Sequence, residues 1–440
     1  MVMKTYKIIV IAIILLIVGG IGYYFLSNKT ASDNIPSSVI KKAIENDGNK
    51  TVVDLNSLTF EGTGMTIEND VIYIVYGGTY EFTGSTSSNI IIDIQDDKDV
   101  YLVFNNINIA SSSAPINIVQ GDVFITLKDG TNNYLEYNKD YSSNEEVTAA
   151  IYSSDDITIA GNGKLEIKSN YDAISSKDTI TIENGEYIIN VLGDGIQAKD
   201  SVTINDGKFD IKTGDGYVAT SKSMDFGMWN NETKNSDDRS SKGIKSSNLI
   251  VINGGTFNFD VSDDAIHSDG NLTISSGKFI IQSSDDAIHA DGLVTIDGGE
   301  FEITASEGIE ATYVKINDGT ININATDDGI NAGDKSKEYE TTIEINGGNI
   351  TIKMASGDTD GIDSNGNLYI NGGTINVTCN SPFDYDGEAK YTGGTMIVNG
   401  EKTTTITNQM MGGMAPGGPM DGQKMNQNNQ NNMNKKGGRI

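Results

Sequence analysis

A triplet of an acidic residue, a small residue and isoleucine recurs at nearly constant spacing through the middle of the chain. The triplets begin at Asp172, Asp194, Asp264, Asp286, Glu307, Asp328 and Asp360. Their isoleucines are 22 residues apart in the first pair (196 − 174) and then 22, 21 and 21 residues apart from Ile266 to Ile330. Two longer steps carry insertions, the larger of which contains SMDFGMWNNETKNSDDRS. A chain with this period must build one structural unit per repeat and stack the units on one another.

Each repeat has the pattern of strands and turns. Short alternating runs of Ile, Val, Thr and Phe are separated by Gly, Asn and Asp, and no convincing stretch has helical periodicity. Eight residues after each anchor isoleucine an apolar residue returns and a turn follows, as in Ile204-Asn-Asp-Gly. A period near 22 is typical of a parallel β-helix, whereas leucine-rich repeats need an L-x-x-L-x-L pattern and propeller blades about twice the length. We therefore predict an all-β parallel β-helix with the isoleucines in its core and a column of asparagines at one turn.

The segment 8–26 is an uncharged run long enough to cross a hydrocarbon core of about 30 Å as a helix. Lys4 and Lys7 precede it, so the positive-inside rule places the N-terminus in the cytoplasm and the bulk of the chain outside. A cleaved signal peptide is the alternative, but its apolar region would be unusually long, and 27–32 has no good small-x-small cleavage site. We expect a single-pass protein of the cell membrane whose bulk is extracellular.

The composition changes at both ends of the repeat region. After Asn408 the chain consists mainly of Met, Gly, Asn and Gln, which cannot bury a core, so we expect this tail to be disordered. The predicted organisation is a cytoplasmic N-terminus with a transmembrane anchor (1–28), a linker (29–50), the parallel β-helix (51–407) and the tail (408–440).

The balance of charge excludes several classes of function. Lys+Arg 31 against Asp+Glu 61 gives a net charge of −30, which repels phosphate backbones and argues against nucleic acid as a partner. The same charge points to cations as partners, above all Ca²⁺. One cysteine and two histidines rule out internal disulfides and Cys-rich metal sites, and they argue against a conventional His-based zinc or catalytic centre.

Several runs of the repeat region resemble a known family. The runs YDAISSKDTITI, GDGIQAKDSVTINDGKF, SKGIKSSNLIVINGGTF and DDAIHSDGNLTISSGKF closely resemble bacterial cell-surface carbohydrate-binding proteins, and the resemblance covers about 55–400. The resemblance implies a right-handed parallel β-helix, similar in fold to certain pectate lyases. It further implies binding of calcium and of plant cell-wall polysaccharides, namely cellulose and pectic acid.

The acids of the triplets would stack in one column with Lys242 between two groups of them, where its charge would neutralise neighbours. Carboxylates about 4.8 Å apart repel by about 1 kcal/mol per pair in water, and more in a cleft, so the column needs countercharge. Ca²⁺ takes six to eight oxygen ligands in loose geometry. The predicted ligands are Asp172, Asp194, Asp263, Asp264, Asp269, Asp285, Asp286, Asp291, Glu307, Asp327, Asp328 and Asp360. The alternative is a solvated acidic face that only keeps the solenoid soluble.

Other side chains are candidates for contact with sugar. His267 and His289 hold one position in adjacent repeats, and each is followed two residues later by an aspartate. This pair could hold a transition metal, but exposed polar side chains or sugar contacts are the favoured interpretation. Trp229 lies in the larger insertion and could stack on a sugar ring or fold back onto the coil. The predicted carbohydrate-contacting residues are Trp229, Lys242, Lys245, His267 and His289.

Catalysis has little support in the sequence. There is no G-x-S-x-G elbow and no glycine-rich phosphate loop. The run DDAIH is superficially similar to the paired aspartates of polygalacturonases, but the face carrying it lacks basic residues to hold a substrate carboxylate. A lyase would need a lysine as its base, and the candidates are Lys177, Lys199, Lys242 and Lys245. We predict an extracytoplasmic, calcium-dependent, non-catalytic polysaccharide-binding protein. The alternatives are a calcium-dependent pectate-lyase-like enzyme and a scaffold or adhesin without a carbohydrate ligand.

Overall fold

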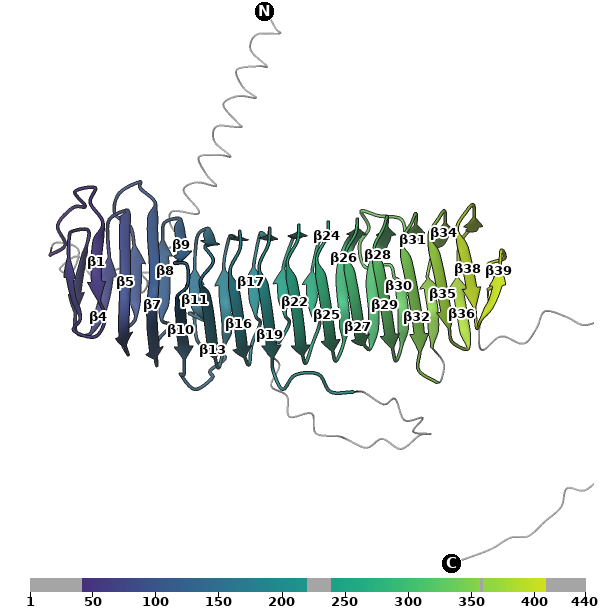
Figure 1. Cartoon of the computed structure of the whole chain (residues 1–440), viewed down its shortest axis with the longest axis horizontal. Coiled ribbons are helices and arrows are strands. Elements are labelled where there is room, and N and C mark those ends of the chain that lie inside the picture. The colour runs from purple at the N-terminus through teal and green to yellow at the C-terminus, as the bar shows by residue number, and fades with distance from the viewer. Residues whose placement is uncertain (1–41, 220–238, 357–358, 409–440) are drawn as a thin grey trace, which may run out of the picture. The chain divides into compact units, whose positions relative to one another are not determined.

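The computed structural model describes residues 42–219, 239–356 and 359–408, and Figure 1 shows them as a stack of β-coils. These residues form 39 strands and no helix. Most strands pair in parallel with the strand at the same place in the next coil, which confirms the predicted parallel β-helix. Its handedness stays a prediction.

The strands form three ladders that run along the stack. Ladder 1 consists of β4 (Val71–Ile74), β6 (Ile90–Asp93), β8 (Ile116–Gln120), β11 (Ala149–Ser153), β14 (Asp172–Ser176), β17 (Ile196–Ala198), β20 (Ile244–Ser246), β23 (Ile266–Ser268), β26 (Asp286–Ile296), β28 (Glu307–Ile316), β30 (Asp328–Ala332), β33 (Asp360–Ser364) and β36 (Ser381–Tyr385). Ladder 2 consists of β1 (Thr51–Asp54), β5 (Gly78–Thr86), β7 (Val100–Ser111), β9 (Val123–Leu127), β12 (Ile157–Ala160), β15 (Thr179–Ile182), β18 (Ser201–Ile204), β21 (Leu249–Ile252), β24 (Asn271–Ile274), the second halves of β26 and β28, β31 (Thr342–Ile345), β34 (Asn367–Ile370) and β37 (Ala389–Tyr391). Ladder 3 consists of the second halves of β5 and β7, β10 (Asn132–Tyr137), β13 (Lys164–Ser169), β16 (Glu186–Val191), β19 (Lys208–Thr213), β22 (Thr256–Val261), β25 (Lys278–Ser283), β27 (Glu300–Ala305), β29 (Thr320–Ala325), β32 (Asn349–Met354), β35 (Thr374–Thr378) and β38 (Thr395–Val398).

Antiparallel pairs occur at the two ends of the stack. β2 (Thr59–Glu61) pairs with β1 and β3 (Met65–Glu68) pairs with β4 at the N-terminal end. β39 (Glu401–Thr403) pairs with β38 at the C-terminal end. These hairpins occupy backbone groups that an open parallel edge would otherwise leave without partners.

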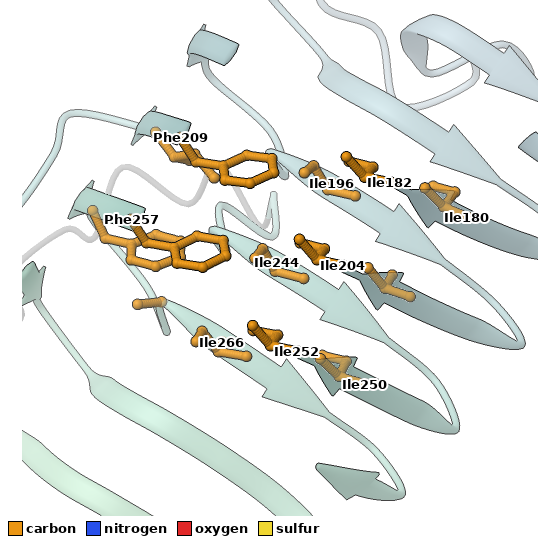
Figure 2. Packing of buried hydrophobic residues seen from close by; sticks show 14 of the residues in the cluster. Ile180, Ile182, Ile196, Ile204, Phe209, Ile244, Ile250, Ile252, Phe257 and Ile266 are labelled. Carbon is orange, nitrogen blue, oxygen red and sulfur yellow. The ribbon is translucent and has the colours of Figure 1, made fainter. Parts of the chain in front are cut away.

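The core of ladder 1 is one continuous column of anchor residues. The members are Ile72, Ile90, Ile116, Ile151, Ile174, Ile196, Ile244, Ile266, Ile288, Ile309, Ile330, Ile362 and Phe383, each paired with the next. All are buried, and Figure 2 shows Ile196, Ile244 and Ile266 stacked in this column. The predicted isoleucine column is therefore confirmed, and it extends four coils further toward the N-terminus and one further toward the C-terminus.

Ladder 3 contributes a stack of buried aromatic rings. Tyr187, Phe209, Phe257, Phe279 and Phe301 lie on successive coils with ring centroids 4.6 to 4.8 Å apart, and Figure 2 shows two of them. Such pairs contribute about 0.5–1.5 kcal/mol each beyond the area that they bury. The spacing of the rings matches the separation of about 4.7–4.9 Å between hydrogen-bonded strands, so the rings pack without disturbing the ladder.

The turn after ladder 2 carries the predicted asparagine column. The Asn253 amide donates to Asn205 Oδ1 over 2.8 Å, and the Asn371 amide donates to Asn346 Oδ1 over 3.0 Å. Gly255 follows in the same turn with φ 107°, and a Cβ there would lie 3.0 Å from the Gly207 carbonyl oxygen. Only glycine combines this backbone conformation with so close an approach.

The membrane prediction falls outside the described residues. In the part of the chain that the structure describes, no helix has the length and hydropathy needed to span a membrane. The predicted anchor at 8–26, Trp229 and the tail from 409 onward all lie outside that part.

Candidate functional site

The acids of the triplets stack in register along ladder 1, as predicted. We call this set the acidic column; it comprises Asp172, Asp194, Lys242, Asp264, Asp286, Glu307, Asp328 and Asp360. Asp286 pairs with Glu307, and Asp328 pairs with Asp360, on neighbouring strands. The amide of Asp194 donates to Asp172 Oδ1 over 2.8 Å, so that one acid orients the next.

A second set of polar side chains lies three residues further along each strand, beyond the anchor residue. We call it the outer column; from β17 onward it comprises Gln197, Lys245, His267, His289, Glu310, Asn331, Asp363 and Asp384. Successive members are partners in the ladder register. Each outer-column residue directly follows a buried anchor residue and therefore points away from the core. The two columns lie side by side, because His267 Nδ1 is 2.7 Å from Asp264 Oδ2 and His289 Nδ1 is 2.7 Å from Asp286 Oδ2.

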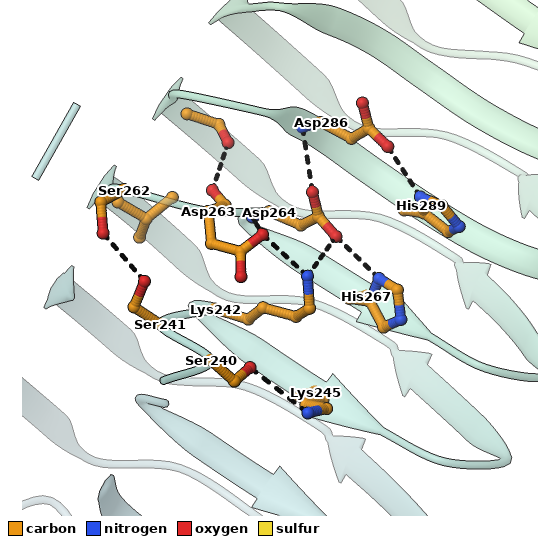
Figure 3. A network of polar contacts seen from close by, with 12 residues as sticks. Ser240, Ser241, Lys242, Lys245, Ser262, Asp263, Asp264, His267, Asp286 and His289 are labelled. Carbon is orange, nitrogen blue, oxygen red and sulfur yellow. Dashed lines mark hydrogen bonds and ion pairs between the residues drawn. The ribbon is translucent and has the colours of Figure 1, made fainter. Parts of the chain in front are cut away.

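One part of the two columns carries its own countercharge, and we call it the compensated segment: Asp194, Lys242, Lys245, Asp263 and Asp264. Lys242 Nζ lies 2.8 Å from Asp263 Oδ1 and 2.7 Å from Asp264 Oδ2, as Figure 3 shows. Lys245 Nζ lies 3.7 Å from Asp194 Oδ2. Lys242 thus neutralises the column between its two acidic groups, as the sequence predicts.

The electrostatics of the compensated segment follow from these contacts. Burial would raise the pKa of Asp264, but hydrogen bonds from His267 and Lys242 outweigh it and hold that pKa well below its usual range. Burial would lower the pKa of Lys242, but Asp264 and Asp263 raise it above the usual value of a lysine. Both groups are therefore charged at neutral pH.

His267 is clamped between two carboxylates. Its Nδ1 lies 2.7 Å from Asp264 Oδ2, and its Nε2 lies 2.9 Å from Asp269 Oδ1. Asp269 is half exposed and lies on the opposite side of the ring from the acidic column. The side chain of His267 is 13% exposed, which is less than the sequence suggested.

His289 repeats this arrangement one coil later and is more buried. Its Nδ1 lies 2.7 Å from Asp286 Oδ2 and 3.1 Å from Glu310 Oε2, and its Nε2 lies 3.3 Å from Asp291 Oδ1. Burial would lower the pKa of His289, but the hydrogen bonds to Asp286 and Glu310 raise it to about 10. His289 is 8% exposed, so the expectation of an exposed side chain is wrong for it, because three carboxylates surround the ring. A protonated imidazole supplies countercharge to the carboxylates around it.

Beyond His289 the balance of charge reverses. We call this the uncompensated segment: Glu307, Asp328 and Asp360 of the acidic column, Asn331, Asp363 and Asp384 of the outer column, and Asp327 beside them. Burial and the neighbouring Glu310 and Asp327 raise the pKa of Glu307 to about 7, against a hydrogen bond from Asn331 that lowers it. At this end of the columns Lys335 Nζ lies 2.8 Å from Glu310 Oε2.

The same effects act further along the uncompensated segment. Burial, Glu307 and Asp363 raise the pKa of Asp328 to about 8. Burial and the charges of Asp360 and Asp384 raise the pKa of Asp363 to about 6. Burial and the neighbouring acids thus oppose the ionisation of these carboxylates.

Two buried oxygen atoms in the uncompensated segment have no hydrogen-bond partner in the described part of the chain. They are Asn331 Oδ1 and Asp384 Oδ1. The Asn331 amide nitrogen is engaged, because it donates to Glu307 Oε2 over 3.0 Å and to Glu310 Oε1 over 3.3 Å. A buried acceptor without a partner costs about 1–3 kcal/mol, so these oxygens require a ligand or water.

At the N-terminal end of the acidic column, burial and the neighbouring Asp194 raise the pKa of Asp172 well above its usual value. The Gln197 amide, oriented with its nitrogen toward the column, lies 3.3 Å from Asp172 Oδ2 and 3.0 Å from Asp194 Oδ2. This end is therefore held by an amide and by Lys245.

The structure also groups atoms that could share one metal ion. Three sets have ligand atoms within 4.8 Å of one another: Asp264, His267 and His289; Asp286, His289 and Glu310; and Asp263, Asp264 and Asp285. In the first two sets His289 already contacts Asp286 and Glu310, and Lys242 already contacts two members of the third.

The triplet pattern of the sequence did not identify the outer-column acids as part of the site. Glu310, Asp363 and Asp384 do not belong to the acidic-small-Ile triplet, and their position is occupied by amides, histidines and a lysine in other coils. The available signal was that the residue directly after each anchor isoleucine is polar in every coil from Gln197 onward.

Comparisons with known proteins bear on this site. The family described as "Carbohydrate-binding domain-containing protein" matches residues 68–228, 218–287 and 284–412. A protein of that description from Acetivibrio thermocellus is 35% identical over 115 residues, which cover 24% of this chain and 40% of the relative's length. A solved structure of a polysaccharide lyase-like protein from C. thermocellum, in a gadolinium derivative, is 20% identical with a TM-score of 0.31, over 79% of this chain and 96% of that one.

Proposed function

Because the chain belongs to the family of carbohydrate-binding domain-containing proteins, we propose that it is an extracytoplasmic protein that binds a plant cell-wall polysaccharide in a calcium-dependent way and does not cleave it. The polysaccharide is of the pectic acid or cellulose class. The observation that carries the proposal is the uncompensated segment, where Glu307, Asp328 and Asp363 lie close to other acids, have raised pKa values, and form no ion pair with a lysine of the described part of the chain.

The types of donor in the uncompensated segment suit calcium, although the three close groups of ligand atoms in the described residues lie in earlier coils. Its side chains offer carboxylate and amide oxygens, which are the ligands that Ca²⁺ prefers, and the ion accepts irregular geometry. The orphaned oxygens Asn331 Oδ1 and Asp384 Oδ1 lie among them. The candidate ligands lie on four successive coils, so they would share more than one ion; they are Glu307, Asp327, Asp328, Asn331, Asp360, Asp363 and Asp384. Bound calcium would supply the missing countercharge.

A calcium-loaded acidic face suits an acidic polysaccharide. A net charge of −30 repels a polyuronate. Calcium bound to the acidic face would offer the carboxylates of the polyuronate a positively charged partner. Both columns run along ladder 1 across successive coils, so an extended chain could lie along several of them. The predicted anchor at 8–26 would place this face outside the membrane.

The non-catalytic part of the proposal is supported by the lysines. Lyase chemistry needs a base to remove the proton beside the uronate carboxylate. Lys242 is paired with Asp263 and Asp264, and its pKa is raised, so it would not act as a free base at neutral pH. Lys245 is directed to Asp194 and Ser240.

Retention on insoluble pectate and cellulose, with calcium and with chelator, tests this proposal. We expect calcium-dependent retention that Asp328→Asn together with Asp363→Asn abolishes. The matched control is Asp269→Asn, which removes a half-exposed carboxylate outside the uncompensated segment and should leave retention unchanged. Retention on neither polysaccharide would favour the scaffold or adhesin. Steady formation of an unsaturated product from pectate, lost in Lys242→Ala, would establish the lyase instead.

A further inference from the structure

A hollow of about 340 Å³ lies on the N-terminal side of the acidic column. Its lining includes Asn117, Glu146, Val147, Tyr152, Ser154 and Lys177. Asn117 of β8 and Tyr152 of β11 are partners in the register of ladder 1, and Tyr152 is in turn the partner of Ser175 on β14. The hollow therefore continues the line of the outer column, with the segment between β10 and β11 supplying its wall at Glu146 and Val147.

Three polar side chains of this hollow have no hydrogen-bond partner among the described residues. Tyr152 is 7% exposed, and its hydroxyl makes no hydrogen bond to any residue that the structure describes. The side chains of Asn117 and Ser154 likewise have none within the described ranges. Other buried tyrosines of the solenoid are satisfied; the Tyr187 hydroxyl, for example, donates to the Asn184 carbonyl oxygen over 2.8 Å. The Tyr152 hydroxyl is not one of the buried atoms without a partner in the described chain, so solvent reaches it, and it can bond a ligand that enters the hollow.

The hollow also has a cation, which distinguishes it from the uncompensated segment. Lys177 Nζ lies 5.5 Å from the centre of the Tyr152 ring. The carboxylate of Glu146 is exposed at the rim. Hydroxyl and amide groups, an ammonium group and a carboxylate that accepts hydrogen bonds are together complementary to a sugar that carries hydroxyls and one carboxylate. The volume lies at the lower end of the range for small-ligand sites, which suits one such residue.

We propose that this hollow is a subsite for one uronate residue of the polysaccharide, bound by Lys177 at its carboxylate and by Asn117, Tyr152 and Ser154 at its hydroxyls. The inference rests on the proposed function and deepens it. The subsite differs from the uncompensated segment in one respect that can be measured. Its positive charge comes from the Lys177 side chain, so binding at this subsite does not need calcium.

Isothermal titration calorimetry with trigalacturonate in the presence of chelator tests the subsite. We expect the full chain to bind the acidic trisaccharide and not to bind cellotriose. Lys177→Met should weaken binding roughly tenfold to hundredfold, as the loss of a charged hydrogen bond does. Tyr152→Phe keeps the ring and removes one neutral hydrogen bond, so it should weaken binding roughly threefold to tenfold.

Lys390→Met is the matched control, because Lys390 Nζ lies 5.4 Å from the Tyr369 ring on ladder 2, away from the hollow. It should leave affinity unchanged, and circular dichroism should show all three variants folded. Absence of binding in chelator, or equal affinity of Lys177→Met and Lys390→Met, would overturn the subsite. If the subsite fails, calcium-dependent retention on pectate would still support the proposed function. If the protein binds trigalacturonate in chelator but is not retained on pectate with calcium, only the subsite would stand.

Discussion

The compensated and uncompensated segments occupy the same ladder of the same solenoid, yet the pKa values of their carboxylates are shifted in opposite directions. The pKa of Asp264 is held below its usual range, whereas the pKa of Asp328 is raised to about 8. Both side chains sit two residues before a buried anchor isoleucine. The difference therefore arises from the neighbours: Lys242 and His267 contact Asp264, while Glu307 and Asp363 face Asp328. A repeat can keep its backbone constant and still carry two different electrostatic sites.

The largest expected effect comes from breaking the compensated segment. Lys242→Met leaves the side chain of Asp264, which is 4% exposed, without its cation. Removing one partner of a buried pair destabilises by about 3–5 kcal/mol. Lys212→Met is the control, since Lys212 pairs with Asp260 over 2.9 Å at the surface and should cost about 1 kcal/mol or less. Urea unfolding would measure both, and equal losses would show that Lys242 is not an essential countercharge.

Calcium should stabilise the uncompensated segment. An ion that binds only the folded state stabilises it by about 2.7 kcal/mol at one hundred times its Kd, so chelator should lower the melting temperature. Asp328→Asn should remove most of this gain, and it should raise the melting temperature in chelator because it relieves repulsion. A melting curve that chelator leaves unchanged would contradict the calcium assignment.

A carboxylate outside both columns shows what full compensation does. Hydrogen bonds from Lys50 and Lys128 lower the pKa of Glu81 to about 2, and burial opposes them. The Lys128 pair is 2.9 Å long. A lowered pKa contributes stability above the ordinary value near 4.5, and this stability is lost as the pH falls toward 2. Because both lysines are about half exposed, we expect Glu81→Gln to cost about 1–2 kcal/mol at pH 7. Its unfolding free energy should fall less between pH 4.5 and pH 2 than that of the wild type, and parallel pH profiles would contradict this.

The smallest expected effect concerns the core, where the same substitution in the two segments should lower the free energy of unfolding by nearly the same amount. If the two segments differ only on the outside, Ile244→Val beside Lys242 and Ile330→Val beside Asp328 should each cost about 0.5–1.5 kcal/mol. Both isoleucines are fully buried. Chemical unfolding in chelator would show whether the losses agree, and a clearly larger loss at one site would show that the core also differs.

Much of the fold follows from the sequence because its signal is periodic. The triplets located the anchor column from Ile174 to Ile362, and the Asn-Gly turns located the asparagine column. Ile72, Ile90, Ile116 and Ile151 were missed because no acid-small pair precedes them and their spacing is irregular. The aromatic stack of ladder 3 was not anticipated either.

The site was only partly predictable, for a physical reason. Asp264 and Asp328 look alike in sequence, and what separates them is a cation contributed by a neighbouring coil. The sequence shows that Lys242 interrupts the acidic column, and its ion pairs with Asp263 and Asp264 confirm that it neutralises its neighbours. The raised pKa of Asp363 depends on burial together with Asp360 and Asp384, and only the coil register brings Asp384 beside it.

Calcium titration calorimetry on segment variants tests the central claim most directly. Asp328→Asn with Asp363→Asn neutralises the uncompensated segment, and Asp194→Asn changes a side chain of the compensated segment that Lys245 and Ser240 already contact. We predict that the double variant loses calcium binding while Asp194→Asn keeps the stoichiometry and affinity of the wild type. Unchanged binding in the double variant, or loss of binding in Asp194→Asn, would contradict the account.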